Sequence, residues 1–206
     1  MRTLKVTMFV TLDGVIQAPG GPDEDKEGDF EHGGWQGAHS DETIGEEVMR
    51  FMDNPFDLLL GRKTYDIWNA FWPHHTGPIA EKFARAHKYV ASRTLDEAEW
   101  APSTLIKDVP GEVAKLKAGS GPELHVYGSA NLIQTLLKHG LIDEFHLMIY
   151  PVLLGDGKKL FAEGTLPMGM QVVDSKISPR GIVIATYKPA GDLVYTTMGE
   201  EAEARA

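Results

Sequence analysis

ELHVYGSANLIQTLL, at residues 123–137, holds a predicted strand, a turn of small residues and the start of a predicted helix. Leu124 and Val126 alternate as in a strand that enters a core, and Gly-Ser-Ala follows at 128–130. From Asn131 to His139 the apolar side chains recur at helical spacing, and the next residue is a glycine, a typical helix stop. The free N–H groups at the start of such a helix favour an anion, so the turn is a candidate phosphate site. A tight packing turn without a ligand is the alternative that this stretch alone leaves open.

Two further strand ends carry cationic and hydroxyl side chains. FDLLL at 56–60 has the continuous apolar character of a buried parallel strand, and GRKTY at 61–65 opens a predicted helix. Gly61 permits a tight turn there, and the next three residues offer anion donors beside a helix N-terminus. Lys88–Ala91 is a third predicted strand, followed by Ser-Arg-Thr at 92–94.

These three units share one design, which is a strand, a polar or small turn and then a helix. Parallel strands with right-handed crossovers place such turns on one edge of a sheet. A dinucleotide is an extended, multiply phosphorylated ligand that would span them. Arg62 and Arg93 at separate turns indicate an extra phosphate, which favours NADPH over NADH. The glycine fingerprint of ordinary dinucleotide-binding dehydrogenases is absent from the sequence.

The first predicted strand, Leu4–Thr11, ends close to a carboxylate. Asp13 and Gly14 follow it, which places an acid at the carboxyl end of a central strand, where open α/β sheets bind ligands. An aspartate that only stabilises a turn is the alternative reading of this dipeptide.

Residues 17–39 have no hydrophobic period and are rich in proline, glycine and acidic residues. A loop this long in a compact domain is usually functional or disordered. Phe30 and Trp35 argue against disorder, so we expect a lid or a partner-facing flap. Ser40 is the expected cap of a helix that runs to about Asp53, with the acidic residues at 41–47 on its solvent face.

The remaining pattern completes a single domain over residues 1–190. Further helices are expected at 78–86 and 110–118, strands at 105–106 and 142–150, and a hairpin from 170–177 and 182–188. Residues 191–206 are predicted to be a flexible acidic tail.

Composition limits the function classes. The 206 residues carry a formal net charge of -10, which argues against nucleic acid or an anionic membrane as the main partner. No cysteine is present, so a disulfide, a thiolate metal site and a cysteine nucleophile are excluded. The histidine spacing matches no known metal-ligand pattern, and no metal is expected. No apolar run is long enough to cross a membrane and no signal peptide is visible, so a cytoplasmic protein is expected.

Several of these motifs resemble one superfamily. LLLGRKTYD at 58–66 resembles the Gly-Arg-Lys-Thr-Trp motif of dihydrofolate reductases, and HVYGSANLIQTLL at 125–137 resembles their later strand, Gly-Gly turn and helix. VTLDGVI, IDEFHLMIYPVLLGDGKKLF and the closing hairpin are more similar to the reductase domain of the bacterial riboflavin-biosynthesis deaminase/reductase. The resemblance spans roughly residues 4–189.

The resemblance implies a dihydrofolate reductase-like, three-layer α/β/α fold, with a mostly parallel sheet and a C-terminal antiparallel hairpin. It also implies NADPH along the strand ends. Adenosine phosphates would be held by the turns after two strands, at Gly61, Arg62, Thr64, Ala91, Ser92 and Arg93. The pyrophosphate would lie at the later turn, formed by Tyr127, Gly128, Ser129, Ala130, Asn131 and Leu132. Val10 and the turn that contains Asp13 would lie by the nicotinamide, with Asp13 as the candidate catalytic residue.

The implied activity is NADPH-dependent reduction of a small heterocyclic or carbonyl substrate. A non-catalytic nucleotide-binding or regulatory domain that keeps the fold is the alternative. The family also implies a homodimer, for which the sequence offers the apolar run at 147–154 and the hairpin as indirect support. No zinc-ligand pattern of a deaminase is present, and no acidic residue of the first helix can be assigned to a pteridine.

Overall fold

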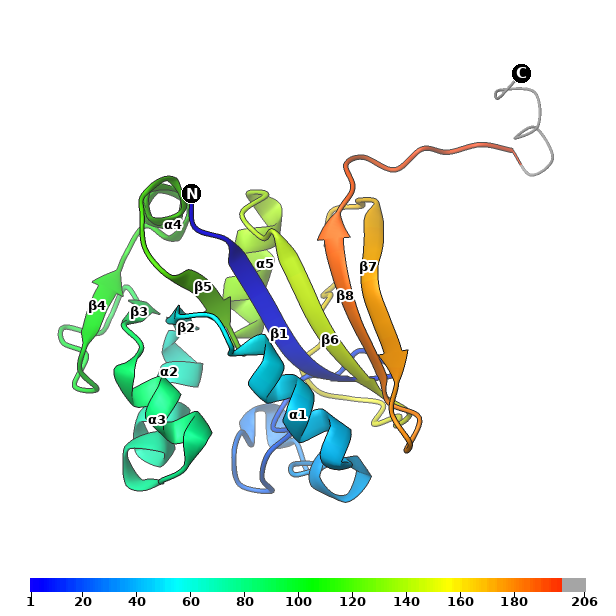
Figure 1. Ribbon diagram of the computed structural model, residues 1–206, viewed down its shortest axis with the longest axis horizontal. Coiled ribbons are helices and arrows are strands. Elements are labelled where there is room, and N and C mark those ends of the chain that lie inside the picture. The colour runs from blue at the N-terminus through cyan, green and yellow to red at the C-terminus, as the bar shows by residue number, and fades with distance from the viewer. Residues whose placement is uncertain (198–206) are drawn as a thin grey trace.

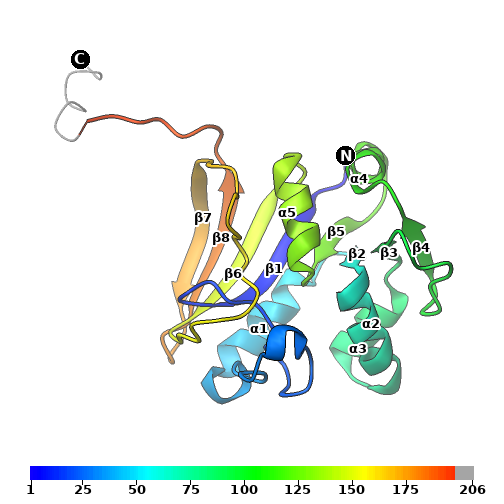
Figure 2. The ribbon, with the colours of Figure 1, turned by 180° about the vertical axis from the view of Figure 1, so that it is seen from behind.

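The computed structural model describes residues 1–197 and contains one eight-stranded sheet with helices on both faces (Figures 1 and 2). The strands are β1 (Leu4–Thr11), β2 (Phe56–Gly61), β3 (Lys88–Ala91), β4 (Ser103–Ile106), β5 (Glu123–Val126), β6 (Glu144–Tyr150), β7 (Met170–Ile177) and β8 (Val183–Pro189). The helices are α1 (Glu42–Phe51), α2 (Arg62–Phe71), α3 (Pro78–Arg85), α4 (Val109–Ala118) and α5 (Ala130–Lys138). Short 3-10 turns lie at η1 (Glu27–Asp29), η2 (Gly37–His39) and η3 (Trp72–His74).

The strand order is β4-β3-β2-β5-β1-β6-β8-β7. All pairs from β4 to β6 are parallel, and β8 pairs antiparallel with both β6 and β7. The carboxyl ends of β3, β2, β5 and β1 are therefore neighbours on one edge. This architecture confirms the predicted three-layer fold with a mostly parallel sheet and a C-terminal antiparallel hairpin.

Strand alternation separates two core layers. Leu59 of β2 packs with α5 on one face, while Leu58 and Leu60 pack with α2 and α3 on the other. The α5 face buries Val6 and Val126, which alternate with polar neighbours along β1 and β5. Figure 2 shows α5 in front of the sheet, and Figure 1 shows α1 on the opposite face. None of the described helices is long and apolar enough to cross a membrane.

Two details of the predicted first helix are wrong. Asp41 occupies the N-cap position of α1, while the Ser40 hydroxyl is engaged with the Tyr150 hydroxyl at 2.9 Å. Glu47 was expected on the solvent face but is 3% exposed. It is buried because its carboxylate accepts hydrogen bonds from Arg50 on its own helix and from a lysine of β7, at 2.6 Å in the latter case.

The third predicted unit also differs from expectation. No helix follows β3; residues 92–102 form a loop that leads directly to β4. The Ser92 hydroxyl accepts hydrogen bonds from the N–H groups of Thr94 and Leu95, which fold the chain into a local turn instead. A helix start, the feature on which the predicted anion sites depend, thus follows two of these strands rather than three.

The β6 part of the apolar run offered as support for a dimer belongs to the interior, whereas Leu153 is 70% exposed. Leu147, Met148 and Tyr150 of β6 are buried between β1 and β8. Exposed apolar side chains also lie on the edge strand β7, every residue of which is exposed. Residues 191–197 leave β8 as exposed chain without helix or strand, and the rest of the predicted tail lies outside the described residues.

Candidate ligand-binding edge of the sheet

The turns after β2 and β5 meet at the carboxyl edge, although their motifs lie far apart in the sequence. The Gly61 N–H donates to the Ser129 hydroxyl at 2.7 Å, and that hydroxyl donates to the Thr64 hydroxyl at 2.8 Å. A Cβ added at Gly61 would lie 2.6 Å from both the Cβ and the Oγ of Ser129. A Cβ added at Gly128, whose φ is +149°, would lie 3.2 Å from Thr64. Glycine at both positions therefore lets the two turns approach closely.

Two helices begin at these joined turns. The N-cap residues of α2 and α5 are Gly61 and Ser129, and neither makes a side-chain capping hydrogen bond. Neither helix carries an acidic residue in its first turn. The N–H groups of both first turns thus lack side-chain caps, and the helix dipoles favour negative charge at this place. The pair of helix starts fits a phosphate-bearing ligand.

The two predicted phosphate-binding arginines are on the surface. The Arg62 guanidinium donates from Nε to both carboxylate oxygens of Asp66 at 2.8 Å, one helical turn along α2. Arg93 is exposed in the loop after β3, next to the buried Ser92. Because β3 neighbours β2, these arginines lie at adjacent strand ends, as the sequence predicted.

Asp13 lies at the end of β1 and binds the loop that follows β6. Its carboxylate accepts a hydrogen bond from the Thr11 hydroxyl at 2.5 Å and another from the Gly155 N–H at 2.8 Å. Longer contacts of 3.3 and 3.4 Å reach the Leu154 N–H. The Thr11 hydroxyl is the main cause of a lowered pKa at Asp13, with the backbone donors adding to it. Asp13 is therefore ionised at neutral pH and joins two loops; its predicted catalytic role stays a prediction.

Three other predicted residues place their side chains in the core. Val10 and Leu132 are each 5% exposed within the α5-side core, so only their backbone faces the edge. Tyr127 belongs to an aromatic group with Trp68 and Phe83 on the α2 side. Burial raises the pKa of its hydroxyl, which makes a 3.0 Å hydrogen bond with Nδ1 of a neighbouring histidine.

The remaining predicted residues at this edge differ in exposure. Ala91 is half-buried against the α5-side core, and Ala130 packs there as the first residue of α5. Asn131 follows it and is exposed, so its side chain is free to meet a ligand.

Sequence reasoning missed how the long acidic segment, residues 17–39, is held in the structure. Gln17 is 3% exposed, and its side-chain amide donates to the Asp25 and Glu27 carbonyls while its oxygen accepts from the Lys158 N–H at 3.0 Å. A buried glutamine in a polar segment carries no recognisable pattern. In the sequence, only the opposite charges of this segment and of the lysines that bind it could have indicated how it is held.

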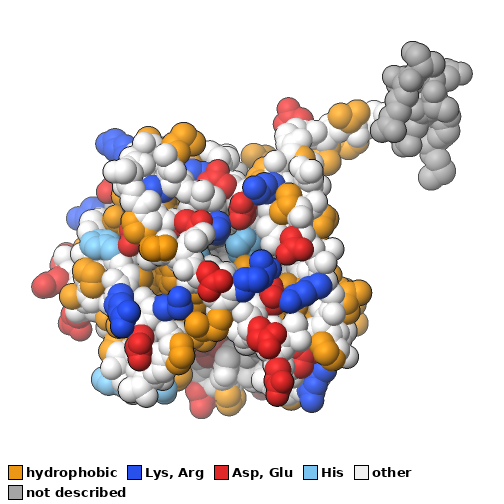
Figure 3. Space-filling model, in the orientation of Figure 1, with side chains coloured by type: hydrophobic (Ala, Val, Ile, Leu, Met, Phe, Trp, Pro, Cys, Tyr) orange, Lys and Arg blue, Asp and Glu red, His pale blue; other side chains and the backbone are white. Residues whose placement is uncertain are grey.

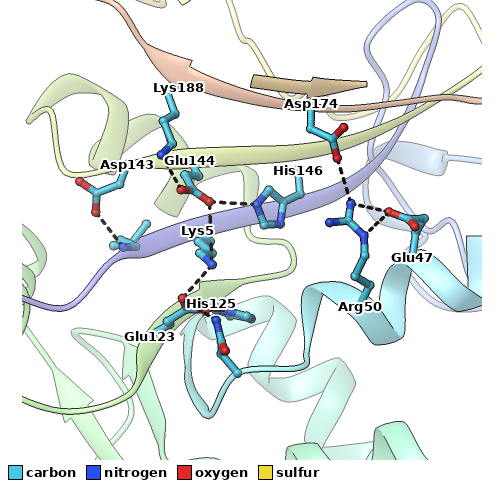
Figure 4. Close-up of polar contacts among 12 residues, drawn as sticks. Lys5, Glu47, Arg50, Glu123, His125, Asp143, Glu144, His146, Asp174 and Lys188 are labelled. Atoms are coloured by element: carbon cyan, nitrogen blue, oxygen red, sulfur yellow. Dashed lines mark hydrogen bonds and ion pairs between the residues drawn. The ribbon is translucent and has the colours of Figure 1, made fainter. Parts of the chain in front are cut away.

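A second polar cluster lies on the α1 face, toward the amino ends of the strands (Figure 4). Lys5 of β1 pairs with Glu123 at 2.8 Å and with Glu144 at 3.8 Å, so it bridges β5 and β6. Each glutamate accepts from a buried histidine on its own strand, His125 at 3.0 Å and His146 at 3.1 Å. Burial lowers the pKa of His125 to about 4 and also lowers that of His146. Lys188 of β8 also pairs with Glu144, at 3.1 Å, so two lysines balance the two glutamates and we assign this cluster a structural role.

The space-filling view of that face shows acidic, basic and histidine side chains interspersed over its centre (Figure 3). Two surface hollows, of about 500 and 420 Å³, share Arg2 in their lining. Neither is lined by a residue of the joined turns. Among the described residues there is no group of three acidic or histidine side chains that would hold a metal ion.

Comparison with known proteins agrees with this geometry. The family model described as the RibD C-terminal domain matches residues 2–184. The uncharacterized protein YyaP of Bacillus subtilis is 34% identical over 194 residues, which cover 90% of this chain and 94% of YyaP. The chain therefore belongs to the RibD C-terminal domain family, whose reductase fold the sequence motifs indicated.

Two solved structures share the fold. A protein from Shewanella sp. PV-4, provisionally named a riboflavin biosynthesis protein, has a TM-score of 0.68 and 24% identity, covering 91% of this chain and 98% of its own. Dihydrofolate reductase from Enterococcus faecalis, solved with NADP(H), has a TM-score of 0.59 and 13% identity, covering 91% and 96%. At these identities the likeness concerns the fold.

Proposed function

We propose that this chain is an NADPH-dependent oxidoreductase that reduces a small heterocyclic or carbonyl substrate. The observation that carries the proposal is the junction of Gly61, Thr64 and Ser129, where two helix starts without side-chain caps meet at the end of a parallel sheet. Membership of the RibD C-terminal domain family and the NADP(H) bound to the Enterococcus dihydrofolate reductase support the choice of ligand.

The residues present fit a dinucleotide in its expected order along the edge. The strand order brings the turn with Arg93, the turn with Arg62, the turn with Ser129 and the turn with Asp13 side by side. Neighbouring strands are about 4.8 Å apart, so the outer two of these turns are separated by roughly 14 Å. We assign the first two turns to the adenosine phosphates, the third to the pyrophosphate, and the last to the nicotinamide end.

When bound, the nicotinamide supplies a hydride, and this chain supplies orientation and a route for a proton. The lowered pKa of Asp13 keeps it as a carboxylate, so its proposed part is to orient substrate and relay a proton from water rather than to donate its own.

A nicotinamide-fluorescence titration tests the cofactor assignment. We expect NADPH to bind more tightly than NADH, and Arg62→Gln to weaken NADPH by about tenfold or more, because one charge-assisted phosphate contact contributes about 1.5–3 kcal/mol. Arg85→Gln is the matched control, since Arg85 is also an exposed arginine paired one turn away, with Glu81 on α3. Equal affinity for both cofactors, or equal losses in the two variants, would contradict the assignment.

A screen of heterocyclic and carbonyl compounds for NADPH oxidation tests the catalytic half. Oxidation that depends on one compound identifies the substrate class. Tight NADPH binding without oxidation by any member of the panel would favour the alternative, a nucleotide-binding domain without catalysis.

We also propose that the protein forms a homodimer through β7. Met170, Val172, Val173 and Ile177 on this edge strand are 37%, 52%, 46% and 71% exposed. An exposed apolar edge strand is a place where a second chain commonly pairs.

A further inference from the structure

The acidic segment crosses the candidate phosphate site. It leaves the end of β1, yet its residues Asp25 and Glu27 reach Lys63, the second residue of α2, which follows β2. The strand order is β2-β5-β1, so β5 lies between the two points that this contact joins. The segment therefore passes over the end of β5, where Gly128 and Ser129 form the proposed pyrophosphate turn.

The tip of this segment, residues 23–29, is held by ion pairs and by the Gln17 amide, which donates to the Asp25 and Glu27 carbonyls. Lys63 Nζ lies 2.7 Å from Glu27 and 3.3 Å from Asp25, and Lys158 Nζ lies 2.5 Å and 2.6 Å from the same two residues. Hydrogen bonds from Lys158 and then from Lys63 lower the pKa of Glu27 to about 2, so both acids are ionised at neutral pH. Residues 23–29 are all polar or glycine, so this tip buries no apolar side chain.

The base of the segment is held differently. Phe30 and Trp35 are 4% and 7% exposed in the core beneath α1, and the Trp35 indole donates to the Gln17 carbonyl at 2.9 Å. The tip buries no apolar side chain, and the Glu27 carboxylate is 56% exposed, so we expect the tip to open at smaller cost than a base held by buried aromatics. The segment thus has a fixed base, which contains Phe30 and Trp35, and a releasable tip at residues 23–29.

We infer that Asp25 and Glu27 form a latch that closes over the end of β5, and that an anionic ligand releases it by competing for Lys63. The release half of this inference rests on the proposed dinucleotide function. Lys63 adjoins Thr64, whose hydroxyl is part of the junction with Ser129, so a phosphate at that junction meets the cation that the latch already holds. The two carboxylates and the phosphate then compete for Lys63. The free energy that keeps the latch closed therefore lowers the apparent affinity for the ligand.

Hydrogen exchange of the 20–30 peptide, followed by mass spectrometry, tests the latch without a ligand. We expect faster exchange in Glu27→Gln than in the unaltered protein. Asp23→Asn is the matched control, because Asp23 lies on the same segment, loses the same charge and pairs only locally with Lys26. Equal exchange in the two variants would overturn the latch.

NADPH titrations test the competition. We expect Glu27→Gln to bind NADPH about three- to tenfold more tightly than Asp23→Asn, the range for one or two partly exposed ion pairs. In a Lys63→Met background this gain should largely disappear, since the cation in dispute has been removed. A gain of the same size in both backgrounds would show that general charge repulsion, and not competition at Lys63, is responsible.

Inorganic pyrophosphate separates this inference from the proposed function. Faster exchange of the 20–30 peptide on adding pyrophosphate, with no NADPH binding by any variant, would support the latch and refute the dinucleotide assignment. No change in exchange with either saturating pyrophosphate or bound NADPH would refute release by anions.

Discussion

Replacing Gly61 with alanine tests whether the turns after β2 and β5 are joined as described. The backbone of Gly61, with φ -75° and ψ 159°, suits any residue, so the substitution introduces no backbone strain. The new Cβ would lie 2.6 Å from the Cβ and Oγ of Ser129, a separation that the structure cannot keep. Ser129 must therefore move and give up its hydrogen bonds to the Gly61 N–H and the Thr64 hydroxyl.

The expected cost follows from these contacts. Overpacking costs about 1–3 kcal/mol, and each lost hydrogen bond adds about 1 kcal/mol. We expect Gly61→Ala to lower the free energy of unfolding by about 3–5 kcal/mol. Ser129→Gly alone should be almost neutral, because the loss of two hydrogen bonds is offset by removing a side chain from a residue at φ +72°.

Combining the two substitutions gives the decisive measurement. With glycine at 129, the nearest atom to the new Cβ is Cβ of Leu132 at 3.6 Å, an ordinary contact. Gly61→Ala should then cost less than about 0.5 kcal/mol, so the coupling energy from urea denaturation should exceed about 2.5 kcal/mol. Gly45→Ala on α1 is the control, because nothing lies within 4 Å of its Cβ and alanine favours a helix. The same cost for Gly61→Ala in both backgrounds would refute the junction.

Three further predictions concern stability and assembly. Asp13→Asn should lower the free energy of unfolding by about 1–3 kcal/mol at pH 7, because an amide offers one acceptor where the carboxylate offered two. Lost turnover by the folded variant would in addition support the relay role, and full turnover would contradict it. Unfolded chains protonate His125 below about pH 6.5 and the folded protein only near 4, so stability should fall as pH drops through this window, by up to about 3 kcal/mol. In urea denaturation, the free energy of unfolding of His125→Gln should fall less steeply over this pH window than that of the unaltered protein. His139→Gln, at an exposed histidine, is the control. Equal pH dependence in the two variants would contradict the role given to His125. Val172→Lys on β7 should give a monomer by light scattering at micromolar concentration, and a monomeric parent protein would refute the proposed dimer.

Local pattern was sufficient for most elements of the fold. The strand predicted at Leu4–Thr11 and the strand at Lys88–Ala91 have these bounds in the structure, because apolar and β-branched runs are specified by neighbouring residues. The burial of Glu47 was not predictable in the same way. Its partner Lys176 lies on β7, far along the chain, so only the folded arrangement reveals that the charge is compensated.

The charged cluster on the α1 face illustrates the same limit. Lys5, Glu123 and Glu144 each alternate with buried apolar neighbours, and that alternation is visible in the sequence. Their pairing requires the order β5-β1-β6 and the register that sets Lys5 beside both His125 and Glu144. Strand order is a long-range property, and no local period encodes it.

Strand order also gives the candidate site its chemistry. In the sequence, the turn at Gly61 and the turn at Gly128 are separate motifs, each compatible with simple packing. Because β5 inserts between β2 and β1, the turns after β2 and β5 become neighbours, and the acidic segment from β1 must cross the turn after β5 to reach Lys63. The same insertion therefore creates the proposed phosphate site and places a competing pair of carboxylates beside it. A ligand able to bind there must outcompete two ionised acids for one lysine, which favours a polyanion over a singly charged molecule.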